Sequence, residues 1–550
     1  MGIFSADFVF YAENNDTYSI AARSSMIGRL IILIKFWRGI VMAKKCSRAL
    51  SLILCAVMLG TSFVSCSEEG ARNSDETAAG STGTESTTTT ATETETEEEK
   101  KGPDLPEVNY GGYEFRMLGK GQQQPHWQSK DLTADEMNGE PINDAVYERN
   151  AYVGDKYGVK FIEYAVADYF SQQTEFSQSV NSGSDEYDMA ALKPEGVVSS
   201  FINNGYLIDL KTVPHIDLER EWYDQNSISQ MSLGGKVFSV MGDMLTMDDD
   251  ATAAVFFNKK LADSNGLPNL YDMVNEGTWT IDKLTEYAAA AANDANGDGA
   301  MDEKNDVWGA LSEYATTFAL ISGSGYTMIN KDENDIPIDA SMDEHYIAMY
   351  EKVLKLQNNW DITLYAEGVS GYSDVWTQCM DVTFQSDRAL FNVCWLNRAS
   401  LFREMETDFG IIPMPKYDEA QDGYHSFVHM YCANCIIIPK TNRDLDRTGV
   451  IIEALSAASV DTLKPAYYDK ALKGKGSRDE ESSKMLDIIF ATRIFDLGYM
   501  FNWGSVYTNV GSLAGKKGGD ISGYSSTMQK AAKLVPKTIQ KTMDKVNEIE

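Results

Sequence analysis

The chain has 550 residues, with 48 lysines and arginines against 82 aspartates and glutamates, which gives a net charge of −34. An apolar content of 43% and an aromatic content of 11% are typical of globular protein, so wholesale disorder is excluded. The strong negative charge argues against nucleic acid or anionic lipid as a partner, because both require a basic surface. The length suits about two to four domains.

Residues 42–65 have the features of a bacterial lipoprotein signal peptide. A short basic start precedes an apolar stretch over 49–59, and small residues follow. The sequence FVSC that ends at Cys66 resembles a lipobox, with Phe63 where leucine is usual. We therefore expect lipidation of Cys66; the alternative is an ordinary secretion signal with a cysteine there by chance.

The signal begins at an internal methionine, Met42, and residues 1–41 show no clear domain pattern. Codons for Trp37, Arg38 and Gly39 can contain a ribosome-binding sequence shortly before the Met42 codon. Residues 1–41 are therefore predicted to be untranslated leader, and a genuine N-terminal extension is the alternative.

Residues 66–106 consist largely of serine, threonine, glycine and glutamate. Such a segment cannot bury apolar surface and is expected to be a disordered tether. About 40 flexible residues would have a reach of roughly 35 Å.

From residue 107 onward, apolar runs alternate with helical patterns, which indicates an α/β architecture with parallel strands. The first half predicts strands over 113–118, 159–165, 187–192, 236–241 and 253–257, and helices over 144–157, 168–180 and 196–204.

The second half begins with a helix-rich stretch, and strands return later. Helices are expected over 259–265, 281–292 (capped by Thr280), 344–358 and 399–407, and strands over 389–395, 409–414 and 430–439. This return predicts two lobes that exchange chain segments: lobe 1 over about 107–257 plus a returning segment, and lobe 2 over about 258–426 plus C-terminal helices.

Several segments in order resemble the carbohydrate-type, family 1 extracellular solute-binding proteins of bacterial ABC importers. They are GGYEFRMLG, PINDAVYERN, LGGKVFSVMGD, VFFNKKLADSNGLPNLYDMVNEGTWTIDKL, ALFNVCW and DFGIIPMPKYDEAQDGY. The resemblance implies a two-lobed, hinged, periplasmic-binding-protein-like fold of type II with a helix-rich second lobe. It also implies a monomer without enzymatic activity that captures an oligosaccharide and delivers it to permease subunits. The protein would sit on the extracellular face of the cytoplasmic membrane, held by its lipid only.

Aromatic residues near predicted strand ends and breaks are the candidates for sugar binding. Sugars stack their apolar faces on aromatic rings, and their hydroxyls take hydrogen bonds from polar side chains. For each ring alone, packing in the core is the alternative interpretation. The candidate ligand-binding residues are Trp127, Trp222, Asp243, Trp376, Trp395, Arg398, Tyr431 and Trp503.

An acidic loop follows the EF-hand pattern at most of its positions, which predicts a structural Ca²⁺. Asn305 stands where a bidentate glutamate is usual, and Asp306 is one residue late; a turn that holds no ion is the alternative. The candidate ligands are Asp294, Asn296, Asp298, Ala300, Asp302, Asn305 and Asp306.

The sequence gives weaker support to a zinc site, a redox site or a glycosidase. His425 and His429 have metal-pair spacing, but a strand would hold them about 13 Å apart, so with Cys432 and Cys435 they favour a buried strand over a zinc or redox site. The many carboxylates leave a secreted glycosidase open, and a surface glycan-adhesion lipoprotein is the other alternative.

Overall fold

The computed structural model describes residues 102–549 except 122–126, 167–168 and 469–479. The leader, the signal peptide, Cys66 and most of the tether lie outside the described residues. Leu105 and Val108 already pack against a hydrophobic core, so the folded part begins slightly earlier than the predicted residue 107. Among the described residues, no helix combines the length and apolarity needed to cross a bilayer.

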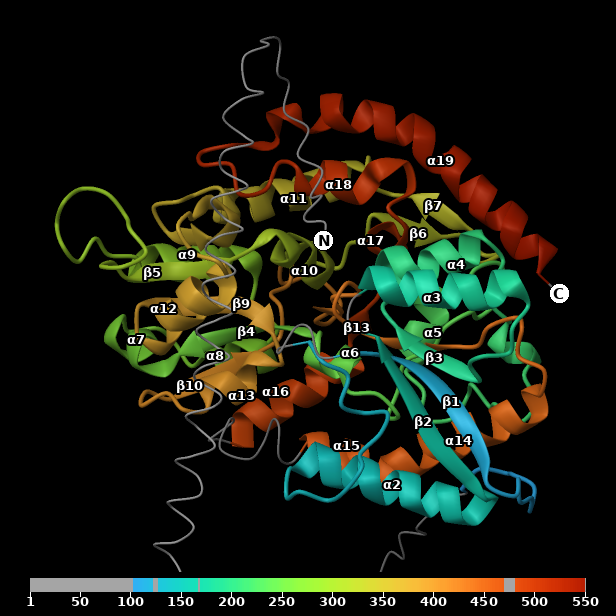
Figure 1. Ribbon diagram of the computed structural model, residues 1–550. Coiled ribbons are helices and arrows are strands. Elements are labelled where there is room, and N and C mark those ends of the chain that lie inside the picture. Colours follow the sequence, from blue (N-terminus) through green and yellow to red (C-terminus); the bar gives the residue numbers. More distant parts are fainter. Residues whose placement is uncertain (1–101, 122–126, 167–168, 469–479, 550) are drawn as a thin grey trace, which may run out of the picture. The chain divides into compact units, whose positions relative to one another are not determined.

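The first sheet has the strand order β12-β3-β1-β2, in which β1 pairs in parallel with β2 and β3, and β12 is antiparallel to β3 (Figure 1). One face packs on α2 and α14, and the other on α3 and α4. The bounds are β1 (Tyr113–Lys120), β2 (Val159–Val166), β3 (Met189–Leu192), β12 (Cys435–Ile437), α2 (Pro141–Tyr157), α3 (Tyr169–Ser182), α4 (Ser199–Asn203) and α14 (Leu445–Asp461).

Local sequence signals set the ends of α2. The Glu140 carboxylate accepts from the Asn143 N–H, and Pro141 occupies the first turn, where its missing N–H costs nothing. Gly158 ends the helix at φ 64°. A side chain there would be strained, and its Cβ would lie 2.2 Å from the Asn109 Oδ1. The chain therefore turns directly from α2 into β2.

The second sheet has the order β10-β4-β9-β5-β8, with β4 antiparallel to both neighbours and β5 parallel to both of its own. Its strands are β4 (Ala253–Asn258), β5 (Trp308–Ser312), β8 (Thr363–Tyr365), β9 (Ala389–Trp395) and β10 (Phe409–Ile412). Its helices are α7 (Lys259–Ser264), α8 (Leu270–Asn275), α9 (Ile281–Ala291), α10 (Tyr314–Gly323), α11 (Glu344–Gln357), α12 (Val382–Gln385), α13 (Arg398–Phe402) and α16 (Glu480–Ala491).

The remaining elements connect the two sheets or cover them. The long helix α19 packs on α18, on α4 and on β7, so it contacts parts of both lobes (Figure 1). These elements are α5 (Gln225–Met231), α6 (Met247–Asp250), β6 (Ile329–Lys331), β7 (Pro337–Asp339), β11 (Ser426–Phe427), α15 (Leu463–Ala466), β13 (Arg493–Ile494), α17 (Leu497–Phe501), α18 (Val506–Gly511) and α19 (Tyr524–Glu548).

The α/β class and most predicted elements are confirmed, including Thr280, whose hydroxyl caps α9 by accepting from the Lys283 N–H. Five expectations were wrong. Both sheets are mixed rather than parallel. Residues 236–241 form isolated bridges instead of a strand, and only 435–437 of the strand predicted over 430–439 forms. Strand β4, assigned to lobe 1, belongs to the second sheet, where β9 and β10 supply its hydrogen bonds. The C-terminal helices do not all belong to lobe 2, because α14 packs on α2 and α19 contacts both lobes.

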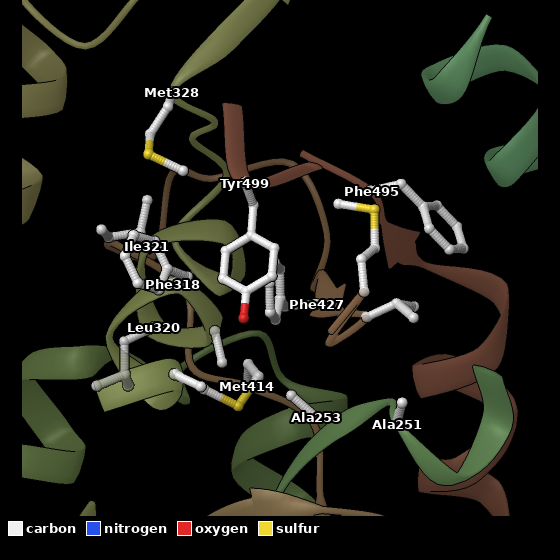
Figure 2. Close-up of a cluster of buried hydrophobic side chains, with 14 of the residues drawn as sticks. Ala251, Ala253, Phe318, Leu320, Ile321, Met328, Met414, Phe427, Phe495 and Tyr499 are labelled. Atoms are coloured by element: carbon white, nitrogen blue, oxygen red, sulfur yellow. The ribbon is translucent and has the colours of Figure 1, made fainter. Parts of the chain in front are cut away.

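The chain passes between the sheets at α6, which leads into β4, and again between β10 and β12. Arg493 of β13 joins these passages. Its strand pairs with β11, with Ser426 opposite Arg493, and its buried guanidinium pairs with Asp248 at 3.1 Å, with Asp249 at 2.7 Å and with Asp224. Tyr499 packs between Phe318 and Phe427 at ring-centroid distances of 5.3 and 5.1 Å (Figure 2). Side chains from distant parts of the chain thus form one core at the junction of the lobes.

Candidate functional site

A tight turn begins at His429, on the passage from the second sheet back to the first. The His429 carbonyl accepts from the Cys432 and Ala433 N–H groups at 2.8 and 3.0 Å. The His429 N–H donates to the Ala251 carbonyl at 2.9 Å, on the other passage between the sheets. The turn is therefore held directly at the junction of the two lobes.

Four aromatic rings surround the His429 imidazole. Trp395, the last residue of β9, stacks on it at 4.4 Å and 22°, and Tyr431 lies nearly parallel to it at 6.0 Å. Trp127 and Tyr499 meet it edge-on at 6.3 and 5.8 Å. We call these five residues the junction cluster. Trp395 and Tyr499 are buried, but 38% of Tyr431 is exposed, so the cluster reaches the surface.

The imidazole of His429 is buried and neutral. Burial, and secondarily the nearby positive charge of Lys193, lower its pKa to about 3. Its Nδ1 atom has no hydrogen-bond partner among the described residues. A buried polar atom without a partner costs free energy, and a ligand hydroxyl would supply the missing hydrogen bond.

A carboxylate from the second lobe adjoins the cluster. Glu313 directly follows β5 and precedes α10, and its Oε1 accepts from the Trp395 indole N–H at 2.9 Å. Burial, and then repulsion from Glu367, raise its pKa to about 7. Hydrogen bonds from Trp395 and Trp376 act in the opposite direction and lower the pKa. Trp376, which is 43% exposed, therefore lies beside the same carboxylate as Trp395 and adds an exposed ring to the site. A carboxyl group that is easily protonated here can both donate to and accept from hydroxyls.

The predicted Arg398 forms a buried ion pair at the start of α13. Its Nε lies 3.2 Å from the Asp381 Oδ1. Burial raises the pKa of Asp381 to about 6, although Arg398 opposes the shift. Burial raises the pKa of the Cys432 thiol in the turn; Glu313 raises it further and Arg398 lowers it, so both side chains lie near the turn.

Three predicted binding residues lie elsewhere. Trp222 packs in the core of the first lobe, and Asp243 pairs with Lys464 at 3.1 Å. Trp503 stacks on Phe501 at 4.3 Å, and its indole N–H donates to a hydroxyl of α19. None of the three contacts the five rings of the junction cluster.

Sequence reasoning missed three residues of the site. His429 was considered only as a metal ligand or as part of a buried strand, and Glu313 and Tyr499 were not singled out. Glu313 had one usable signal, because it directly follows the apolar strand β5, at a strand end where functional side chains collect. For His429 the decisive fact is the stacking on Trp395, 34 residues away in sequence, which no local pattern reveals.

The acidic loop uses its carboxylates on its own backbone. Asp294 accepts from the Gly299 N–H at 2.7 Å, and the buried Asp306 accepts from the Ala295 and Asp302 N–H groups at 3.0 and 2.7 Å. Within the described ranges, no group of three or more histidine, cysteine or acidic side chains is placed to hold a metal. The calcium site stays a prediction. All four described cysteines are free thiols.

No protein-family model and no curated protein matches this sequence. Among solved structures, UspC of M. tuberculosis has a TM-score of 0.51 at 15% identity, and the match covers 77% of this chain and 100% of UspC. An ABC substrate-binding protein from Listeria monocytogenes, solved with cycloalternan, scores 0.47 at 11% identity over 80% of this chain and 100% of that one. A cyclo/maltodextrin-binding protein with maltotetraose scores 0.48 at 13% identity over 80% and 98%. At such identities the likeness concerns the fold alone, which is the α/β, periplasmic-binding-protein-like fold predicted from the sequence.

Proposed function

We propose that this protein is a lipid-anchored extracellular binding protein that captures a carbohydrate, most simply an oligosaccharide, and delivers it to the permease of an ABC importer. The observation that carries the proposal is the junction cluster, five rings at the meeting of two lobes, of which Tyr431 is partly exposed, with the exposed Trp376 near the same Glu313 carboxylate. The structural neighbours described as complexes with cycloalternan and maltotetraose agree with it.

The chemistry of the cluster suits a sugar. Trp376 offers an exposed ring on which the C–H face of a pyranose can stack, and Tyr431 adds the part of its ring that the Lys193 ammonium, 3.8 Å from the ring centre, leaves uncovered. The neutral His429 and the Glu313 carboxyl offer hydrogen bonds to hydroxyls beside those faces. Most of the other rings are already packed, so the site needs little reorganisation to bind, which favours affinity.

Glycan binding is tested by calorimetric titration against a panel of oligosaccharides, with Tyr431→Ala and Trp376→Ala as site variants. Loss of one stacking face is expected to weaken binding by about 1–2 kcal/mol, or about 5–30-fold. Because both side chains are partly exposed, the melting temperature is expected to change little. Tyr152→Ala is the matched control, since Tyr152 is 58% exposed on α2, away from the cluster.

The two alternative functions, a secreted glycosidase and a surface adhesion lipoprotein, predict different results. Release of reducing ends from a bound glycan would indicate a glycosidase, with Glu313 as the first residue to test. Binding to insoluble polysaccharide without uptake of oligosaccharides by cells would favour a surface adhesion lipoprotein. If no glycan binds, or if both site variants bind as the wild type does, the assignment of the junction cluster is wrong.

A further inference from the structure

The long C-terminal helix α19 carries a row of lysines along one side. They follow one another at intervals of three or four residues, and the acidic residues of the helix lie only in its last two turns. At about 100° per residue, the lysine positions fall within about a third of the helix circumference and extend over about 22 Å. We call these residues the lysine row: Lys530, Lys533, Lys537, Lys541 and Lys545.

The opposite side of α19 faces the protein. Val535, Ile539 and Val546 are buried there in the largest hydrophobic core, and the helix packs on α4, α18 and β7. All members of the lysine row are exposed, and Figure 1 shows α19 at the periphery of the folded part. The row is therefore presented to the outside by a helix that is firmly held on its other side.

Most of the row has no partner of opposite charge. Lys545 pairs with Glu548 at 2.6 Å, at the end of the helix. The other four lysines form no ion pair with any residue that the structure describes. In a chain with a net charge of −34 this face is a local exception. The total charge does not decide what it binds, because exposed charges more than about 8 Å away are screened at physiological salt.

An exposed apolar side chain lies within the row. Leu534 is 49% exposed, and its neighbours on the helix surface are Lys530, four residues before it, and Lys537, three residues after it. Ammonium groups around an exposed leucine match the surface of an anionic bilayer, where lysines meet phosphates and the leucine reaches the acyl chains. A soluble polyanion would match the lysines but offer nothing to Leu534.

We propose that α19 is a membrane-contact surface, on which the lysine row binds anionic phospholipid head groups and Leu534 inserts between them. The inference goes beyond solute capture and takes from the proposed function only the lipid anchor at Cys66, which brings a membrane within reach. Residues 66–101 would span up to about 120 Å if extended, which is enough for this face to meet the membrane. A basic surface strengthens attachment through a lipid and fixes which side of the protein faces the bilayer.

The test is cosedimentation with vesicles, using the chain from residue 66 onward with Cys66→Ser, so that no lipid contributes. Vesicles of phosphatidylcholine with one-third phosphatidylglycerol are compared with vesicles of phosphatidylcholine alone. We expect the anionic vesicles to bind about 10-fold more tightly or better. The double variant Lys533→Gln and Lys537→Gln should lose about 10–30-fold in affinity for them, because each lysine near an anionic surface contributes about fivefold.

A second double variant, Lys260→Gln and Lys484→Gln, is the matched control. It changes the net charge equally, and its side chains are 66% and 62% exposed on α7 and α16. It should bind both kinds of vesicle as the wild type does. All substitutions are at exposed positions, so melting temperatures should be unchanged, and their measurement shows that each variant is folded.

Leu534→Ser separates a membrane from a soluble polyanion. It should weaken binding to the anionic vesicles several-fold and leave binding to inorganic polyphosphate unchanged. Equal binding to both kinds of vesicle, or equal losses in the two double variants, would overturn the inference. So would a loss of polyphosphate binding in the lysine-row variant without any change in vesicle binding, since the partner would then be a soluble polyanion. Glycan affinity, measured on the same samples, tests the proposed function separately and should be unchanged throughout.

Discussion

The replacement Glu313→Gln tests the electrostatics of the site directly. The amide keeps an oxygen that can accept from the Trp395 indole, which the Glu313 Oε1 accepts at 2.9 Å. It removes only the ability to ionise. The variant should therefore fold as the wild type does and differ from it in how its stability depends on pH.

The magnitude follows from the pKa of Glu313, which rises from the usual 4.5 to about 7. Below pH 4.5 the group is protonated in both the folded and the unfolded chain, and folding carries no penalty. As the pH rises toward 7, the unfolded chain ionises first, so stability is lost; above about 7 the loss is complete. The full shift corresponds to about 3 kcal/mol, and the solvent that reaches this half-buried group reduces the expected loss to about 1–3 kcal/mol.

The measurement is the free energy of unfolding by urea at intervals between pH 4 and pH 8, for both proteins. Because other buried carboxyl groups titrate in the same range, the informative quantity is the difference between the two curves. The variant should gain about 1–3 kcal/mol relative to the wild type between pH 4 and pH 8. Parallel curves would show that Glu313 ionises as freely in the folded protein as in the unfolded one, and the reasoning about its burial would fail.

Further expectations concern other parts of the chain. Arg493→Met should lower the free energy of unfolding by about 3–5 kcal/mol, because it leaves Asp248 and its neighbours as unpaired buried charges; a urea midpoint like the wild type's would contradict this. If the acidic loop binds calcium, chelator should lower the melting temperature and Asp298→Ala should mimic it, whereas identical melting curves with and without calcium would end that claim. Cys66→Ala should abolish labelling by radioactive palmitate in cells, and labelling that persists would refute the lipid anchor. Mass spectrometry of unprocessed protein should find Met42 as its N-terminus, and a peptide from residues 1–34 would show that the leader is translated.

Local patterns in the sequence were sufficient for most individual elements. Helix α2 has a carboxylate cap, a proline in its first turn and a glycine at its end, all of which act within one segment. Strand β9 was predicted with its observed bounds because a buried strand needs only a continuous apolar run. The aromatic residues of the site were recognisable as candidates for the same reason, since ring type and nearness to a strand end are local properties.

Contacts between distant segments decided which sheet each strand joins and which aromatic rings form the site. Strand β4 could have extended the first sheet, and only its pairing with β9 and β10 places it in the second. A tryptophan near a break has the same local signature whether it packs in a core, as Trp222 does, or stacks in the junction cluster, as Trp395 does. The sequence by itself thus determined the α/β class, the order of the elements and a pool of candidate rings. The tertiary structure decided which rings meet His429, because burial and stacking depend on residues brought together from separate parts of the chain.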